Sequence, residues 1–311
     1  MSDEVTRKVE DAINSSGYPL EFYVGSKIKE SGNIIWYNNY FFDYDLNQAR
    51  TVDITSPAFH HQDLDKTEYT FSRELIVECK KSSDTAWVFF ETPSIVQPNY
   101  MGQFFDFTHY VDGVYSSERV PWIVDSNLET HYGKAEGREK VAQNYQVVKI
   151  GGGVINDDQN KPFKRKDTIF EAANQVTKFM TWLTFKKEGY ALTDFQNKGV
   201  FQIYDLFFPI IVYDGPLYTG FLEGDKISLS KTTNVILEYR YKPRYSSRER
   251  TYLIDIVKKE AFPDLIPTLA KDVDAIENSI KKNKDKIEKL LHDFKLTSER
   301  MKTASNTNPL M

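Results

Sequence analysis

The sequence contains one cysteine, no long apolar run and no excess of positive charge. A single cysteine, Cys79, excludes an intrachain disulfide and a cysteine-based zinc cage, and it is typical of a reducing compartment. No stretch of about 18 apolar residues predicts a membrane-spanning helix, and the opening MSDEVTRKVEDA lacks the apolar core of a signal peptide. The net charge of −5 gives no general attraction to nucleic acid, so such binding would depend on local basic patches. We therefore expect a cytoplasmic protein without a membrane partner.

The composition provides enough apolar material for a large packed core. Hydrophobic residues make up 40% of the 311 residues, and 14% are aromatic. A chain of this length can form one large α/β domain with an appendage. We predict that this domain covers residues 1–260 with an irregular insertion at about 92–165, and that residues 261–311 form a helical extension.

Hydrophobic periodicity predicts the main elements. Helical spacing predicts helices over 3–16, from Pro19 to Gly32, and over 167–187, with one more near 134–147. Strands are predicted at 33–42, 49–56, 73–82, 85–91, 200–213, 216–221, 233–242 and 250–257. His60, His61 and Asp63 fall in a predicted polar loop, where adjacent histidines favour solvent exposure over a metal site.

A long helix is predicted from Pro263 onward. Its apolar residues, among them Leu269, Val273 and Ile276, recur at spacings of 3, 4 or 7. This stripe is consistent with a helix docked on the body or with a homo-oligomer formed through the C-terminal helix.

Four polar residues occur in an informative order. Glu21 lies in the first turn of the second predicted helix, beside its apolar stripe. Asp53 is predicted on the polar face of its strand, opposite Val52 and Ile54, and Glu78 and Lys80 share one face of the apolar strand RELIVECKKS. Clustered carboxylates repel one another, but Mg²⁺ prefers oxygen ligands and would cancel the repulsion. The alternative is a solvated ion pair between Glu78 and Lys80 that contributes little to stability.

The pattern Glu21, Asp53 in RTVDI and Glu78-Cys79-Lys80 in IVECKKS, with intervals of 32 and 25 residues, resembles the PD-(D/E)xK nuclease superfamily, particularly its restriction-endonuclease-like and Mrr-like branches. The resemblance is carried by residues 1–91 and extends to 167–213 only as further core elements. It departs from the motif at Val52, where proline would precede the aspartate. The resemblance implies a restriction-endonuclease-like mixed β-sheet core flanked by helices. It also implies that Asp53, Glu78 and Glu21 bind metal while Lys80 assists the attacking water.

We therefore expect a Mg²⁺-dependent endonuclease or exonuclease, with Mn²⁺ as a substitute ion, that hydrolyses phosphodiester bonds in nucleic acid. The resemblance favours DNA over RNA. Lys80 would orient or help to deprotonate the water, or stabilise the charge of the transition state. The alternative function is a catalytically silent module of the nuclease fold that binds nucleic acid or protein and mediates assembly.

Basic residues mark candidate contacts with nucleic acid. They comprise Lys81, the segment with Arg240, Lys242, Arg244 and Arg248, and a second segment at 161–166. Tyr239, Tyr241 and Tyr245 interleave with the first segment and could stack on unpaired bases. Gln175, in the helix over 167–187, would face the site and contact substrate or metal-bound water, or be an ordinary surface amide.

Overall fold

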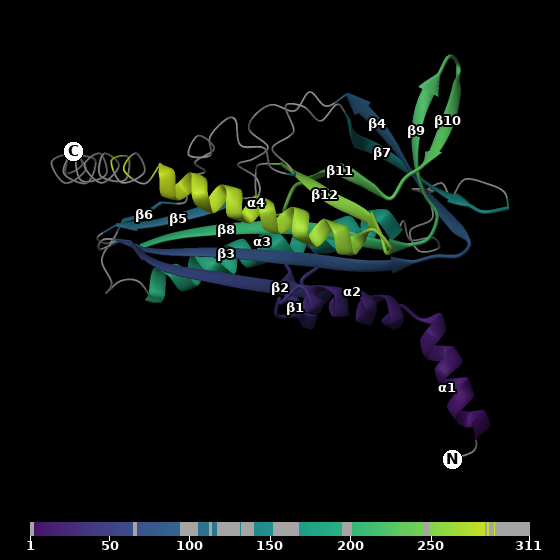
Figure 1. Cartoon of the computed structure of the whole chain (residues 1–311), viewed down its shortest axis with the longest axis horizontal. Helices are drawn as coiled ribbons and strands as arrows, with labels where there is room; N and C mark the ends of the chain where they lie inside the picture. The colour runs from purple at the N-terminus through teal and green to yellow at the C-terminus, as the bar shows by residue number, and fades with distance from the viewer. Residues whose placement is uncertain are drawn as a thin grey trace, which may run out of the picture.

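The computed structural model describes residues 3–64, 67–93, 105–111, 114–116, 131, 140–151, 168–194, 201–244, 249–283, 285 and 289. These residues form a mixed α/β fold in which helices pack on both faces of one large β-sheet (Figure 1). The helices are α1 (Asp3–Ser15), α2 (Tyr18–Glu30), α3 (Thr168–Asp194) and α4 (Phe262–Lys282). The strands are β1 (Trp36–Asp43), β2 (Gln48–Leu64), β3 (Thr67–Lys81), β4 (Thr85–Pro93), β5 (Phe105–Val111), β6 (Val114–Ser116), β7 (Lys140–Lys149), β8 (Phe201–Asp214), β9 (Leu217–Glu223), β10 (Lys226–Lys231), β11 (Asn234–Tyr241) and β12 (Arg250–Lys258).

The sheet is mixed in strand direction. Its strands run in the order β1-β2-β3-β8-β12-β11-β7-β4-β9-β10, and β5 joins β8 and carries β6. Hairpins pair β1 with β2, β2 with β3, β9 with β10 and β11 with β12. β8 runs parallel to both β3 and β12, so the carboxyl ends of these three strands meet at one edge of the sheet.

Two apolar cores separate the layers. On one face α2 and α4 cover the sheet, and their buried residues join Ile54, Leu75 and Val77 in a single cluster. On the other face α3 packs on a second cluster that contains Ile76 and Trp87. Figure 1 shows the two sides, with α4 in front of β8 and α3 behind it.

The sequence of α2 explains where this helix begins, ends and packs. Pro19 occupies the first turn, where the missing N–H costs nothing, and Leu20, Val24 and Ile28 are buried against the sheet. Gly25 allows close contact with β1, since a Cβ there would lie 2.0 Å from the Tyr37 hydroxyl. Gly32 ends the helix with a φ of +83°, as the sequence predicts.

Two local predictions are wrong, and one strand was not predicted. The segment 140–149 is a strand and not part of a helix, because its backbone pairs with β4 and this pairing buries Val141, Ala142 and Val147. The predicted polar loop at His60 is also a strand, since β2 continues to Leu64 and pairs with β3 along that length. The hairpin partner β10 was not predicted, although Gly224, at a φ of +61°, supplies the turn between β9 and β10.

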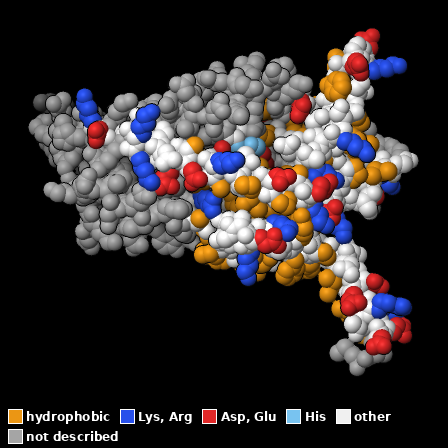
Figure 2. Space-filling model, in the orientation of Figure 1, with side chains coloured by type: hydrophobic (Ala, Val, Ile, Leu, Met, Phe, Trp, Pro, Cys, Tyr) orange, Lys and Arg blue, Asp and Glu red, His pale blue; other side chains and the backbone are white. Residues whose placement is uncertain are grey.

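The terminal helices differ in how they pack. Leu269, Val273 and Ile276 of α4 are buried in the core beside α2, so the part of the C-terminal helix that the structure describes docks on the body. By contrast α1 has no buried residue and extends away from the body, with Val9 52% exposed (Figures 1 and 2). None of the helices in the described part of the chain combines the length and apolarity needed to span a membrane.

A candidate acidic site where two strands separate

The candidate site lies where β2 leaves β3. The two strands pair through their backbones from Leu64 opposite Thr67 to Ile54 opposite Val77. At the next position side chains replace the backbone ladder. The Asp53 amide donates a hydrogen bond to Glu78 Oε1 at 3.3 Å, and the Cys79 amide donates one to Asp53 Oδ2 at 2.8 Å. The fork therefore holds two carboxylates against each other.

The backbone of β2 changes direction at this fork. Val52 belongs to the core under α3, whereas Ile54 belongs to the core under α2 and α4, although regular alternation would place both on one face. On the neighbouring strand Asn38 has a φ of +52°, and neither Asn38 nor Asp53 takes part in the β1–β2 register. The prediction that Val52 and Ile54 face the same way is wrong, because this paired irregularity turns the strand between them.

Glu78 and Lys80 form the ion pair of the site. Lys80 Nζ lies 2.8 Å from Glu78 Oε2, and the Glu78 side chain is only 2% exposed while that of Lys80 is 29% exposed. The sequence alone left open a solvated ion pair on a half-exposed strand as the alternative to a metal site. In the structure the Glu78 carboxyl of this pair is shielded from water. Burying one charge is costly unless a partner compensates it.

The pKa shifts follow from burial. Burial raises the pKa of Glu78 from 4.5 to about 8, an effect that Lys80 opposes and Asp53 reinforces. Burial also raises the pKa of Asp53, with Lys80 opposing the shift. For Lys80, burial lowers the pKa, but the charges of Glu78 and Asp53 outweigh it and leave the pKa above its ordinary value. Lys80 is thus held as an ammonium group beside two carboxyls that retain protons more strongly than usual.

Glu21 lies within electrostatic range of Asp53 and Lys80. Burial and then the charge of Asp53 raise its pKa, and Lys80 lowers it. The described ranges contain no group of three or more His, Cys, Asp or Glu side chains that could hold a metal ion. The structure brings Asp53, Glu78 and Lys80 together and leaves Glu21 beside them.

Gln175 supports the fork from the α3 side. Its Nε2 donates a hydrogen bond to the backbone carbonyl of Thr51, two residues before Asp53, and its Oε1 is buried without a hydrogen-bond partner in the described structure. Gln175 is therefore not a free surface amide. Its observed contact is structural.

The predicted basic residues lie in two places. Lys81 is exposed at the end of β3, where its Nζ donates to the Asn14 carbonyl at 3.1 Å. Arg240 is exposed near the end of β11, and Lys242 and Arg244 are exposed just after it. Arg248 and the segment 161–166 lie outside the described residues.

The carboxylate of Asp45 fixes the chain around Tyr241 and Arg244 to the β1–β2 turn. It accepts hydrogen bonds from the Tyr241 hydroxyl at 2.6 Å and from the Arg244 amide at 2.9 Å, and it lies 3.1 Å from Lys178 Nζ. Eight residues of extended chain separate this turn from Asp53, which is about 26 Å. The expectation that tyrosines here are available for stacking is wrong for Tyr239, which is buried, and Tyr241 is bound to Asp45.

Comparison of the chain with protein-family models, with curated proteins and with solved structures finds no match in any of the three.

Proposed function

We propose that the protein is a metal-dependent phosphodiesterase of the restriction-endonuclease-like class that acts on nucleic acid. One observation carries the proposal: Asp53, Glu78 and Lys80, drawn from two strands that separate at this point, are held together around the buried carboxyl of Glu78. This arrangement agrees with the order of residues that resembles the PD-(D/E)xK superfamily.

The donor set fits a hard divalent cation. Mg²⁺ typically uses one or two protein carboxylates and retains water for the substrate phosphate, so a pair such as Asp53 and Glu78 suffices in number. Both carboxyls have raised pKa values because burial disfavours their charged forms, and a bound cation would stabilise those charged forms. When bound there, Mg²⁺ would polarise the phosphate and lower the pKa of a water ligand.

The remaining residues suggest complementary roles. Lys80, whose pKa is raised, is suited to orient the water and to stabilise negative charge, and it is poorly suited to remove a proton. Glu21 is near enough to influence Asp53 and could accept a hydrogen bond from a metal-bound water. Lys81 directly follows Lys80, and it would contact the phosphate backbone near the scissile phosphodiester.

Cleavage assays on the full chain test the proposal. Supercoiled plasmid, linear duplex, single-stranded DNA and RNA would be incubated with Mg²⁺, with Mn²⁺ or with EDTA. We expect cleavage only with metal, and we expect Asp53→Asn and Lys80→Ala to reduce it at least 100-fold while thermal unfolding shows both variants folded. Lys226→Ala, an exposed lysine on β10, is the matched control and should cleave as the wild type does.

Two outcomes would overturn the hydrolase. Cleavage that persists in EDTA would reject a metal-dependent mechanism, and full activity of Asp53→Asn would reject the site. Binding to nucleic acid without metal-dependent cleavage of any of the four substrates would instead support the silent binding module.

A further inference from the structure

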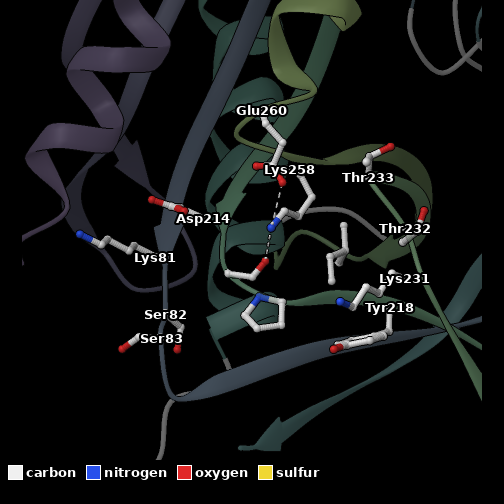
Figure 3. A pocket seen from close by; sticks show the side chains of 13 residues that line it. Lys81, Ser82, Ser83, Asp214, Tyr218, Lys231, Thr232, Thr233, Lys258 and Glu260 are labelled. Atoms are coloured by element: carbon white, nitrogen blue, oxygen red, sulfur yellow. Dashed lines mark hydrogen bonds and ion pairs between the residues drawn. The ribbon is translucent and has the colours of Figure 1, made fainter.

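A pocket of about 870 Å³ opens beside the acidic site (Figure 3). Four chain segments line it: 81–83 after β3, 214–218 between β8 and β9, 231–233 after β10, and 258–260 after β12. A volume of this size is typical of small-molecule and cofactor sites in proteins. It is large enough for a nucleotide.

The topology places the pocket where ligands usually bind. The parallel strands β3, β8 and β12 end at Lys81, Asp214 and Lys258, so their carboxyl ends all reach its wall. In open sheets ligands bind in the crevice outside the carboxyl ends of such strands. Lys81 lies opposite Asp214 in the β3–β8 register, one residue beyond Lys80 opposite Tyr213. The pocket and the acidic site therefore share one strand.

Backbone hydrogen bonds hold the walls in place. Ser82 donates to the Asp214 carbonyl at 3.1 Å, and Lys258 donates through its amide to the Thr233 carbonyl at 2.8 Å. The chain at Gly215 is so crowded that a Cβ there would lie 2.4 Å from the Tyr213 ring and 2.7 Å from the Ser82 carbonyl oxygen. This part of the wall is rigid before any ligand binds, which reduces the entropic cost of binding.

The charges of the pocket favour an anion. Lys258 Nζ donates to the Gly215 carbonyl at 2.8 Å and lies 3.1 Å from Glu260, while Lys259 lies 3.5 Å from Asp214. Each acid of the lining therefore already faces a lysine. Lys231 adds positive charge to the lining that these two acids do not balance.

The side chains divide the pocket into a cationic part and an aromatic part. Figure 3 shows the Nζ atoms of Lys231 and Lys258 directed toward the middle of the lining residues, with the Tyr218 ring below Lys231. Lys81 points outward, as its bond to the Asn14 carbonyl requires. Two ammonium groups next to an aromatic face match a phosphate joined to a base.

We propose that this pocket binds a phosphate-bearing nucleotide, with its phosphate between Lys231 and Lys258 and its base against Tyr218. The nucleotide is either free or the terminal unit of a nucleic-acid strand, and the second source rests on the proposed function. Glu78 lies four positions before Ser82 in the pocket lining, about 13 Å along extended chain, so a strand end held here would bring a nearby phosphodiester within reach of the acidic site.

Binding in EDTA tests the pocket separately from catalysis. The probe is a 3′-fluorescein oligothymidylate of about 12 nucleotides, with a 5′-phosphate or a 5′-hydroxyl, and its binding is followed by fluorescence anisotropy. We expect Lys231→Glu to weaken binding about tenfold at 0.1 M salt, and to reduce the slope of log K against log salt concentration by about 0.7 or more. Lys226→Glu makes the same charge change on the same strand and should leave both values unchanged.

The aromatic part has its own pair of variants. Tyr218→Ala should weaken binding of the oligothymidylate about tenfold through loss of stacking. Tyr40→Ala, which removes a tyrosine that is 73% exposed on β1, should have no effect. The proposed nucleotide site would be overturned if Lys226→Glu weakened oligothymidylate binding as much as Lys231→Glu does, or if Tyr40→Ala weakened it as much as Tyr218→Ala does.

Competitors identify the ligand. Displacement by thymidine monophosphate but not by thymidine supports the pocket and indicates a free nucleotide, whereas displacement only by a 5′-phosphorylated oligothymidylate supports it and indicates a strand end. Displacement by thymidine as effectively as by its monophosphate, or by no phosphorylated competitor, would overturn it. Asp53→Asn should bind the probe normally in EDTA. If the wild type binds the probe here and yet cleaves none of the four substrates with Mg²⁺, the hydrolase is refuted and the pocket remains supported.

Discussion

The buried carboxyl of Glu78 leads to a prediction about stability and pH. In the folded chain its pKa is raised to about 8 by burial, from an ordinary value of 4.5. A group whose pKa is raised on folding binds its proton more tightly in the folded state, so ionisation destabilises the fold. The wild type should lose stability as pH rises from about 4.5 to about 8, and Glu78→Gln, which cannot ionise, should lose less.

The shift sets the size of the effect. One pKa unit corresponds to about 1.4 kcal/mol, so a rise from 4.5 to about 8 gives a ceiling of roughly 5 kcal/mol in the free energy of unfolding. The Glu78→Gln variant also leaves Lys80 without its anionic partner, which opposes the gain. We expect the variant to be more stable than the wild type by about 2 to 4 kcal/mol near pH 9, and to differ little near pH 5.

Urea unfolding followed by tryptophan fluorescence measures this difference, because Trp87 is buried in the core. The titration would run from about pH 5 to 9, with EDTA and with Mg²⁺. A cation that binds only the folded protein stabilises it by about 2.7 kcal/mol at 100 times its Kd. Mg²⁺ should therefore restore stability to the wild type at high pH and have little effect on Glu78→Gln.

Glu223→Gln is the control, since it makes the same chemical change at an exposed position on β9. Its stability should follow that of the wild type at every pH and metal concentration. Parallel curves for Glu78→Gln and the wild type would refute the assignment of a raised pKa to Glu78. An equal effect of Mg²⁺ on both proteins would refute metal binding through this carboxyl.

Three further predictions concern the fold around the site. Gly215→Ala should destabilise the chain by at least 2 kcal/mol in urea unfolding, because the new Cβ would collide with the Tyr213 ring, and an unchanged midpoint would contradict the contact. Asp45→Asn should cost about 1 to 3 kcal/mol at neutral pH and progressively less as the pH falls through the lowered pKa of Asp45, because burial of this carboxyl is outweighed by its bonds to Tyr241 and to basic groups. Val9→Lys on α1 should change the free energy of unfolding by less than about 0.5 kcal/mol, and a larger loss would show that α1 packs against something.

The elements with strong local signals were predictable from sequence. The second helix is marked by Pro19 and Gly32, and both residues occupy the expected positions in α2. The helix at 167–187 and the apolar strands also agree with the structure. The segment around 134–147 failed because its apolar residues fit either period, and pairing with β4 decides for a strand in the part that is described.

The residues of the candidate site could be chosen from sequence, whereas their arrangement could not. The unusual charges of Glu78 and Lys80 on an apolar strand identified both residues. The side on which Asp53 lies depends on an irregular backbone opposite Asn38, and regular alternation could not reveal it. The nucleotide pocket was missed because four distant segments form it, although the turn at Asp214 and Gly215 was recognised as a turn.

The position of the single cysteine has a practical consequence. Cys79 is buried, its amide donates to Asp53, and burial raises the pKa of its thiol well above the ordinary value. A thiol reagent would therefore modify the native chain only when local opening exposes the core around Cys79. The rate of alkylation provides a built-in chemical reporter of local opening at the acidic site, without any engineered label.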